Sequence, residues 1–233
     1  MDFENKYDYV DYFSEGLARV KKDGKYGFIN EKGEEIVSCV YDDVYSFLEG
    51  FAVVEKDGKC GFIDKTGEEV VPCVYDDVWN FLEGFAKVKK DGKYGYIDKT
   101  GEEVVPCIYD YVSGFSEDFA EVTKDGKCGF IDKTGKEVIP CVYELVNSFS
   151  QGVARVKKDK KWGYIDKKGK EVVPCVYDDV FRFSEGFAKV KKDGKYGFID
   201  TTGKEYFGEA AKLIEKFLED IENVKNKDDQ ERE

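Results

Sequence analysis

The sequence contains no histidine, and this absence excludes most covalent active sites. Without histidine, neither a Ser/His nor a Cys/His pair can form, so the usual means of activating a nucleophile is missing. A glycine-rich phosphate loop is also absent. We therefore expect no enzymatic activity and no cofactor.

Positive charge and long apolar runs are also scarce. The formal net charge is -13 and the pI is near 4.7. Nucleic acids and anionic membranes both attract basic surfaces, which this composition does not favour. No segment is apolar over the length of a membrane span, and the N-terminus lacks the basic and apolar regions of a signal peptide. We expect a cytoplasmic, monomeric protein that binds neither nucleic acid nor membranes.

Closely spaced cysteine pairs, which a zinc site requires, are missing although the chain has seven cysteines. Five of them recur at one register of a repeat: Cys39, Cys73, Cys107, Cys141 and Cys175. Antiparallel strands could bring Cys60 near Cys73 and Cys128 near Cys141, so these pairs could oxidise. In a reducing compartment we expect buried free thiols instead, and no metal site.

Repetition is what the sequence has in abundance. One motif returns every 34 residues, and its copies begin at Tyr7, Tyr41, Tyr75, Tyr109, Tyr143 and Tyr177. Such a period indicates units that are too small to bury their own apolar faces and that stack on their neighbours. With 41% hydrophobic and 15% aromatic residues, the stack can bury a sizeable core.

The residues inside one period predict strands rather than helices. Four glycines in the third unit leave no room for the two helices of a tetratricopeptide repeat. Asp91-Gly92 suits a type I′ turn between strands 85–90 and 93–98, and a third strand follows at 103–108. Pro106 should lie at a bulge or a sheet edge. The segment 75–84 forms either a short fourth strand or an ordered loop.

The apolar runs of the second and third strands require cover on both faces, which stacked small sheets provide. We expect an all-β domain over residues 1–208, arranged as a closed propeller-like ring in which Tyr7 to Phe13 completes the last unit; the alternative is an open β-solenoid. Residues 209–224 have the spacing of an amphipathic helix, which packs as a cap or brace or else binds a partner in trans. Residues 225–233 are expected to form a charged, frayed tail.

The fifth unit contains Lys161-Trp162-Gly163-Tyr164-Ile165-Asp166, followed by Val172-Val173-Pro174 and Tyr177-Asp178. This sequence resembles the bacterial WG repeat family, which is named for its Trp-Gly pair. The tryptophan of the pair is replaced in the other units by Tyr26, Cys60, Tyr94, Cys128 and Tyr196, whereas the glycine is always present. The resemblance implies a β-rich repeat scaffold used for binding, without a shared enzymatic activity.

Two adjacent positions differ between copies while their flanks stay nearly constant: Asp11-Tyr12, Tyr45-Ser46, Trp79-Asn80, Ser113-Gly114, Asn147-Ser148 and Phe181-Arg182. A variable pair on a constant scaffold can specify a partner, and several of these residue types are favoured at interface hot spots. We therefore expect a protein partner to contact Tyr12, Tyr45, Trp79, Asn80, Phe181 and Arg182. The alternative is that exposed positions vary without functional consequence.

Lysines flank every hairpin turn and offer a competing function, the binding or sequestering of a small anionic ligand. The lysines that would carry it are Lys56, Lys59, Lys90, Lys93, Lys124 and Lys127. The simpler interpretation is that these lysines are solvated beside neutralising aspartates. Recurrent carboxylates such as Asp42 and Asp76 are expected to cap turns, because equivalent copies do not provide the distinct environments that calcium binding or glycoside hydrolysis requires.

Overall fold

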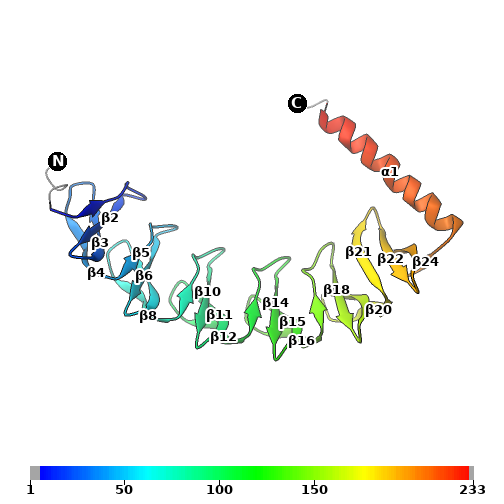
Figure 1. The fold of residues 1–233 in the computed structure, drawn as a ribbon, viewed down its shortest axis with the longest axis horizontal. Coiled ribbons are helices and arrows are strands. Elements are labelled where there is room, and N and C mark those ends of the chain that lie inside the picture. Colours follow the sequence, from blue (N-terminus) through cyan, green and yellow to red (C-terminus); the bar gives the residue numbers. More distant parts are fainter. Residues whose placement is uncertain (1–5, 231–233) are drawn as a thin grey trace. The chain divides into compact units, whose positions relative to one another are not determined.

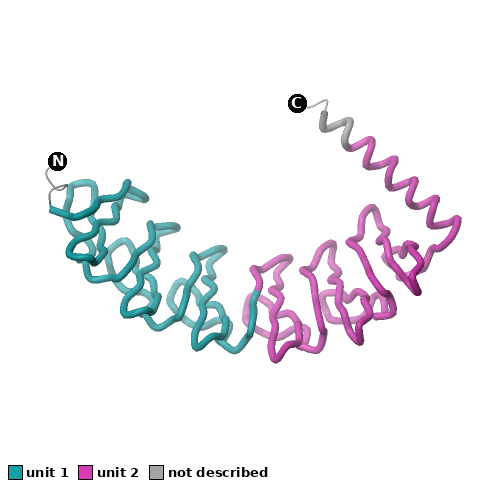
Figure 2. Tube along the Cα trace, viewed as in Figure 1, with its two compact units in different colours: residues 1–112 teal, residues 113–233 magenta. Residues whose placement is uncertain are grey.

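The repeat forms six four-stranded antiparallel sheets, followed by one helix (Figure 1). The structure is a computed structural model that describes residues 6–230. Residues 1–112 and 113–233 form two compact units, shown in teal and magenta in Figure 2, and each unit is described by itself.

The strands of the first unit are β1 (Tyr9–Val10), β2 (Leu17–Lys22), β3 (Lys25–Asn30), β4 (Glu35–Tyr41), β5 (Asp43–Val44), β6 (Phe51–Lys56), β7 (Lys59–Asp64), β8 (Glu69–Tyr75), β9 (Asp77–Val78), β10 (Phe85–Lys90), β11 (Lys93–Asp98), β12 (Glu103–Tyr109) and β13 (Tyr111–Val112). The elements of the second unit are β14 (Phe119–Lys124), β15 (Lys127–Asp132), β16 (Glu137–Tyr143), β17 (Leu145–Val146), β18 (Val153–Lys158), β19 (Lys161–Asp166), β20 (Glu171–Tyr177), β21 (Asp179–Ser184), β22 (Phe187–Lys192), β23 (Lys195–Asp200), β24 (Glu205–Tyr206) and α1 (Glu209–Gln230).

Each sheet is a meander in chain order, and its turns follow from local sequence. Asp91 and Gly92 have φ angles of 51° and 78°, so both central residues of the turn between β10 and β11 are left-handed, as the predicted type I′ hairpin requires. The segment 75–84, which the sequence predicts as either a short fourth strand or an ordered loop, contains both. It holds the short strand β9 and a second tight turn at Glu83 and Gly84, with φ angles of 51° and 90°.

The glycine of the Trp-Gly pair is explained by a backbone contact. A Cβ added to Gly95 would lie 2.4 Å from the carbonyl oxygen of Val105, because β12 bulges against β11 at this point. No side chain fits there without moving the backbone. Pro106 lies in the bulged strand, and that strand is the edge of its sheet, so the prediction for proline is confirmed.

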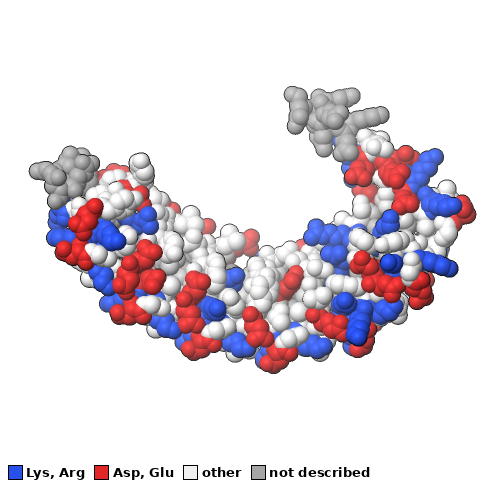
Figure 3. All heavy atoms as spheres, in the orientation of Figure 1, with Lys and Arg blue, Asp and Glu red and all other residues white. Residues whose placement is uncertain are grey.

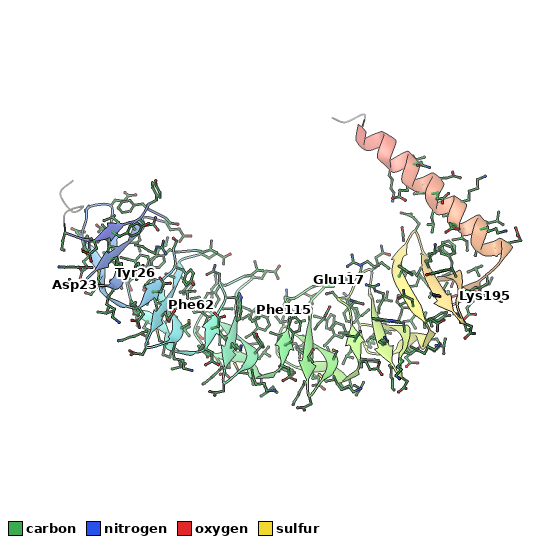
Figure 4. All side chains as sticks on the ribbon, in the orientation of Figure 1. Asp23, Tyr26, Phe62, Phe115, Glu117 and Lys195 are labelled. Carbon is green, nitrogen blue, oxygen red and sulfur yellow. The ribbon has the colours of Figure 1, made fainter. Side chains whose placement is uncertain are left out.

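Within the first unit the core lies between neighbouring sheets, and the second sheet is covered on both faces, as the apolar runs predict. In the second sheet, Phe62 (Figure 4) belongs to a cluster with Phe81 and Ala86 of the third sheet. The next residue, Ile63, points to the other face and packs with Phe28 of the first sheet. Both are at most 1% exposed, and burying a side chain of this size contributes about 1.5–3 kcal/mol.

The expectation that Tyr7 to Phe13 completes the last unit is wrong. Strand β1 pairs with β2 and completes the first sheet, with Tyr9 opposite Lys21 and Val10 opposite Val20. The sixth sheet has its own first strand, β21, which pairs with β22. Pairing within a sheet wins because the Ser14–Leu17 turn closes β1 onto β2 over only a few residues.

The helix α1 lies against the sixth sheet. It buries Ala211, while Lys189 and Glu185 of the sheet form ion pairs with Glu215 and Lys225 at 3.0 and 2.6 Å. The helix continues to Gln230, six residues beyond its expected end at Val224. Two of these six residues are lysines and one is glutamine, which are good helix formers, so a charged composition does not by itself end a helix.

Candidate partner-binding pocket

A pocket of about 400 Å³ lies between the second and third sheets of the first unit. Its lining residues are Tyr45, Val53, Glu55, Gly58, Cys60, Asp76, Asp77, Val78, Trp79 and Asn80. Three of the residues expected to contact a partner, Tyr45, Trp79 and Asn80, therefore line one cavity. The tight stacking of the sheets brings together variable positions of successive repeats, which stand 34 residues apart in the sequence.

The cavity exists because β6 and β7 carry smaller side chains than the equivalent strands of the first sheet. At the position of Val53 the first sheet has Arg19, whose Nη1 reaches the next sheet and donates to the carbonyl oxygen of Val44 at 3.0 Å. At the position of Cys60 the first sheet has Tyr26. A valine and a cysteine cannot fill the space of an arginine and a tyrosine, so the second sheet is left with an opening.

The sign of the charge also changes in the second sheet. Glu55 lies directly opposite Cys60 across the hairpin. In the first sheet the same two positions are Lys21 and Tyr26, with the lysine Nζ 4.6 Å from the ring centroid. The second sheet has thus lost a cation and an aromatic ring, and it has a carboxylate in the place of the cation.

The pKa of the Cys60 thiol shows that the surroundings of the pocket are negative. Burial raises the pKa of Cys60, and the carboxylates of Glu55, Asp77 and Asp43 raise it further. Three negative charges therefore act on one half-buried sulfur atom in the lining of the pocket. An anion is disfavoured at this place, and a cation is favoured.

The walls of the pocket are aromatic. Tyr45 is 56% exposed and Trp79 is 37% exposed. Trp79 packs against Tyr94 with ring centroids 5.9 Å apart, and the Nζ of Lys87 lies 4.3 Å from the centre of the Trp79 ring system. Such a contact is attractive because the face of an indole ring is electronegative.

The other expected contact residues lie elsewhere. Tyr12 is 93% exposed in the loop after β1 and does not line the pocket. Phe181 and Arg182 belong to the second unit, where strand β21 carries them. Arg182 lines a groove of about 530 Å³ beside α1, and Phe181 is 41% exposed.

A third variable position accompanies the predicted pair and was not recognised in the sequence. Its residues in the six repeats are Arg19, Val53, Lys87, Glu121, Arg155 and Lys189. The backbone N–H of Tyr45 donates to the carbonyl of Val53 at 2.9 Å, and Trp79 donates to Lys87 in the same way, so the third position lies beside the pair. The sequence alone could have revealed this position, because its residue varies in charge and size while the alanine before it and the valine after it are constant.

The lysines of the anion-binding alternative are largely occupied in the first unit. Lys59 forms an ion pair with Asp76 of the third sheet at 2.6 Å, and Lys93 pairs with Asp110. Asp76 also accepts a hydrogen bond from the backbone N–H of Gly92 at 3.0 Å, and the bond from Lys59 is the largest cause of its lowered pKa. The recurrent carboxylates thus cap hairpin turns, as predicted, and also link neighbouring sheets.

The remaining lysines of this alternative do not form one basic surface. Lys56 and Lys127 are exposed, and the Nζ of Lys90 lies 5.7 Å from the ring centroid of Tyr75. Lys124 and Lys127 belong to the second unit. Figure 3 shows basic and acidic side chains next to one another in each unit.

All seven cysteines are free, as predicted, although they are half-buried rather than fully buried. Burial raises the pKa values of Cys73, Cys107 and Cys141 to about 11, which keeps these thiols protonated and unreactive near neutral pH.

Within residues 6–230, no group of three or more cysteine, aspartate or glutamate side chains is arranged to hold a metal ion. The helix in this described part is not apolar enough to cross a membrane.

These features define a class of protein, an all-β tandem-repeat protein with stacked four-stranded sheets and a C-terminal helix. The chain belongs to the WG containing repeat family, whose profile matches residues 6–26, 26–60, 61–94, 94–128, 129–162 and 162–196. Apart from the start of the first match at residue 6, these matches begin and end near the Trp-Gly position, so the family's repeat is offset from the sheets, which run from one tyrosine to the next.

Similarity to solved structures is limited. Hsv2 from Kluyveromyces lactis is 11% identical with a TM-score of 0.36, covering 84% of this chain and 72% of that chain. A eukaryotic initiation factor is 14% identical with a TM-score of 0.43, covering 83% and 62%. The tricorn protease is 14% identical with a TM-score of 0.28, covering 85% and 25%. A search of curated proteins found no relative of the chain.

Proposed function

We propose that the protein is a non-catalytic scaffold that binds a protein partner through its variable positions, with the pocket at Tyr45 and Trp79 as the central contact. The observation that carries this proposal is the convergence of Tyr45, Trp79 and Asn80 on one cavity. Binding energy at interfaces concentrates in a few aromatic anchors that fill or line pockets. The repeat scaffold of the family supports a binding role. We also propose that the protein acts as a cytoplasmic monomer without a cofactor.

The test is capture of a partner from the native host, followed by measurement of its affinity for variants of the purified protein. We expect Tyr45→Ala and Trp79→Ala each to weaken the identified partner by about 1 kcal/mol or more. Tyr45 is the cleaner probe because it is more exposed, so its loss should change the melting temperature least.

The matched control is Tyr111→Ala, which removes an aromatic ring of 50% exposure from the same unit but outside the pocket. This variant should bind the partner as the unaltered protein does. Equal losses for Tyr45→Ala and Tyr111→Ala would show that the pocket is not the contact.

The alternative function, binding of a small anionic ligand, receives less support because Lys59 and Lys93 already pair with aspartates. It predicts a different result. If alanine at Tyr45 and Trp79 has no effect, while alanine at Lys56, Lys90 and Lys124 abolishes salt-sensitive binding of an anion, this alternative replaces the first proposal.

A further inference from the structure

In four of the six sheets, a lysine lies over an aromatic ring at the same place in the hairpin. The pairs are Lys21 with Tyr26, Lys89 with Tyr94, Lys157 with Trp162 and Lys191 with Tyr196, and the distances from Nζ to ring centroid are 4.6, 5.3, 5.6 and 5.3 Å. Each lysine is directly opposite its aromatic residue in the strand register. The fold therefore has a recurring place for a cation held against a ring.

The second sheet lacks both members of this pair. Glu55 replaces the lysine and Cys60 replaces the ring, and the pocket opens at this place. The fourth sheet has also lost the pair, with Thr123 opposite Cys128, but it has no carboxylate there. Glu55 thus gives the second sheet a charge that suits a cation supplied from outside.

Two carboxylates of the pocket are available to such a cation. Glu55 and Asp77 line the pocket, and neither forms an ion pair with a side chain in the part of the chain that the structure describes. By contrast, Asp76, which also lines the pocket, is already paired with Lys59. An unpaired carboxylate in a partly enclosed site favours a positively charged ligand.

The Trp79 ring of the aromatic wall already has a lysine of the same chain against it, so this ring can hold a cation and is in part occupied. The Nζ of Lys87 lies 4.3 Å from the centre of the Trp79 ring system. Tyr45, on the preceding sheet, supplies a second ring to the lining. A cationic side chain with an aliphatic stem could place its stem along these rings and its charge beside the carboxylates.

We propose that the pocket takes an arginine or lysine side chain of a protein partner, with Glu55 and Asp77 as its counter-charges and Tyr45 and Trp79 as its walls. This inference rests on the proposed function, because it names the chemistry of the partner that the pocket holds. The net charge of -13 would also accelerate the encounter with a basic partner.

The test uses the full chain and short peptides of defined charge. Trp79 and Trp162 are the two tryptophans of the chain. Trp162→Tyr, which places there the residue of three other repeats, leaves Trp79 as the only tryptophan, whose emission can be excited selectively over that of tyrosine. We expect acetyl-Gly-Arg-Gly-amide and acetyl-Gly-Lys-Gly-amide to change its emission saturably, with weaker binding as salt increases. The neutral citrulline peptide should bind about fivefold more weakly or worse.

The decisive variant is Glu55→Lys with Cys60→Tyr, which restores the lysine and the ring that fill this place in the first, third and sixth sheets. The protein already folds around this pair elsewhere, and a melting curve checks that it does so here. We expect affinity for the arginine peptide to fall about tenfold or more. The matched control, Thr123→Lys with Cys128→Tyr in the fourth sheet, should bind as before.

Equal binding of the arginine and citrulline peptides, no response to any peptide, or unchanged binding by the Glu55→Lys, Cys60→Tyr variant would each overturn the inference. Other results test the proposed function independently of this inference. If the captured partner is lost on Tyr45→Ala but not on Glu55→Lys with Cys60→Tyr, the pocket binds a partner without recognising a cation. If neither change affects the partner, the proposed function itself is wrong.

Discussion

Two residues with positive φ angles close the hairpin between the second and third strands of each sheet, and the fifth repeat departs from the pattern. In five of these six turns glycine occupies the second left-handed position: Gly24, Gly58, Gly92, Gly126 and Gly194. In the fifth repeat this position is Lys160, with φ of 62°. A residue with a Cβ is strained in this conformation by roughly 1–2 kcal/mol.

We therefore expect Lys160→Gly to stabilise the protein. The relief of strain exceeds the additional conformational entropy that glycine gives the unfolded chain, so the net gain should be about 0.5–1 kcal/mol. Urea unfolding measures it. The reverse change in the fourth repeat, Gly126→Lys, is the control and should cost a similar amount. A loss of stability in Lys160→Gly would mean that the lysine side chain makes a contact that outweighs the strain.

At the scale of the element, one turn joins the third and fourth strands of each sheet, and in every sheet but the first it depends on a carboxylate. Asp98 accepts hydrogen bonds from the backbone N–H of Thr100 at 2.8 Å and from its hydroxyl at 2.6 Å, and also from the N–H of Glu102 at 3.0 Å. The bond from the Thr100 hydroxyl is the largest cause of the lowered pKa of Asp98. In the sixth sheet the corresponding Asp200 has its pKa lowered to about 2.

These lowered pKa values predict acid sensitivity with a definite sign. An aspartate whose pKa is lower in the folded state stabilises the protein at pH values above its unfolded pKa of about 3.9, and this contribution is lost as the pH falls toward the folded pKa. We expect the melting temperature to fall as the pH is lowered from about 4 to about 2. The change should be modest, because these carboxylates are in contact with water.

Asparagine can hold this turn without titrating, as Asn30 does in the first sheet by accepting hydrogen bonds from the N–H groups of Lys32 and Glu34. The combined variant Asp64→Asn, Asp98→Asn and Asp132→Asn should therefore fold and should lose less of its melting temperature on acidification. Parallel pH curves for the variant and the unaltered protein, measured by circular dichroism, would contradict the assignment.

At the scale of the whole molecule, the N-terminal segment can be used to test whether a sheet is stabilised only by its neighbours or also by the opposite end of the array. Tyr7 packs in a small cluster with Ala18, Val20 and Ile29, and β1 pairs with β2. In a repeat protein each unit depends mainly on its nearest neighbours.

Deletion of residues 1–13 should therefore weaken the first sheet and leave distant sheets intact. Hydrogen exchange is the appropriate measurement: protection should decrease in β2, β3 and β4 but not in β21, β22 and β23. Loss of protection in the sixth sheet as well would indicate that the two ends of the array support each other, as in the closed ring that the sequence suggested.

The sequence by itself determined the features that depend on neighbouring residues. The period of 34 residues is visible in the sequence itself. The turn at Asp91-Gly92 and the place of Pro106 at a bulge or edge follow from local backbone preferences, and alternating or continuous apolar runs set how many faces of a strand are buried. The variable pair was also visible, since it needs only the comparison of one copy with the next.

Only the tertiary structure decided where those residues meet. The pocket requires Val53 and Cys60 from the second sheet and Trp79 from the third, and the pairing of Lys59 with Asp76 likewise joins two sheets. Both depend on the stacking distance and register of neighbouring sheets, which no single repeat specifies. The tertiary structure also shows that Tyr7 to Phe13 does not complete the last unit. Strand β1 pairs with β2 instead, because a short turn within one sheet costs less loop-closure entropy than pairing with a distant strand.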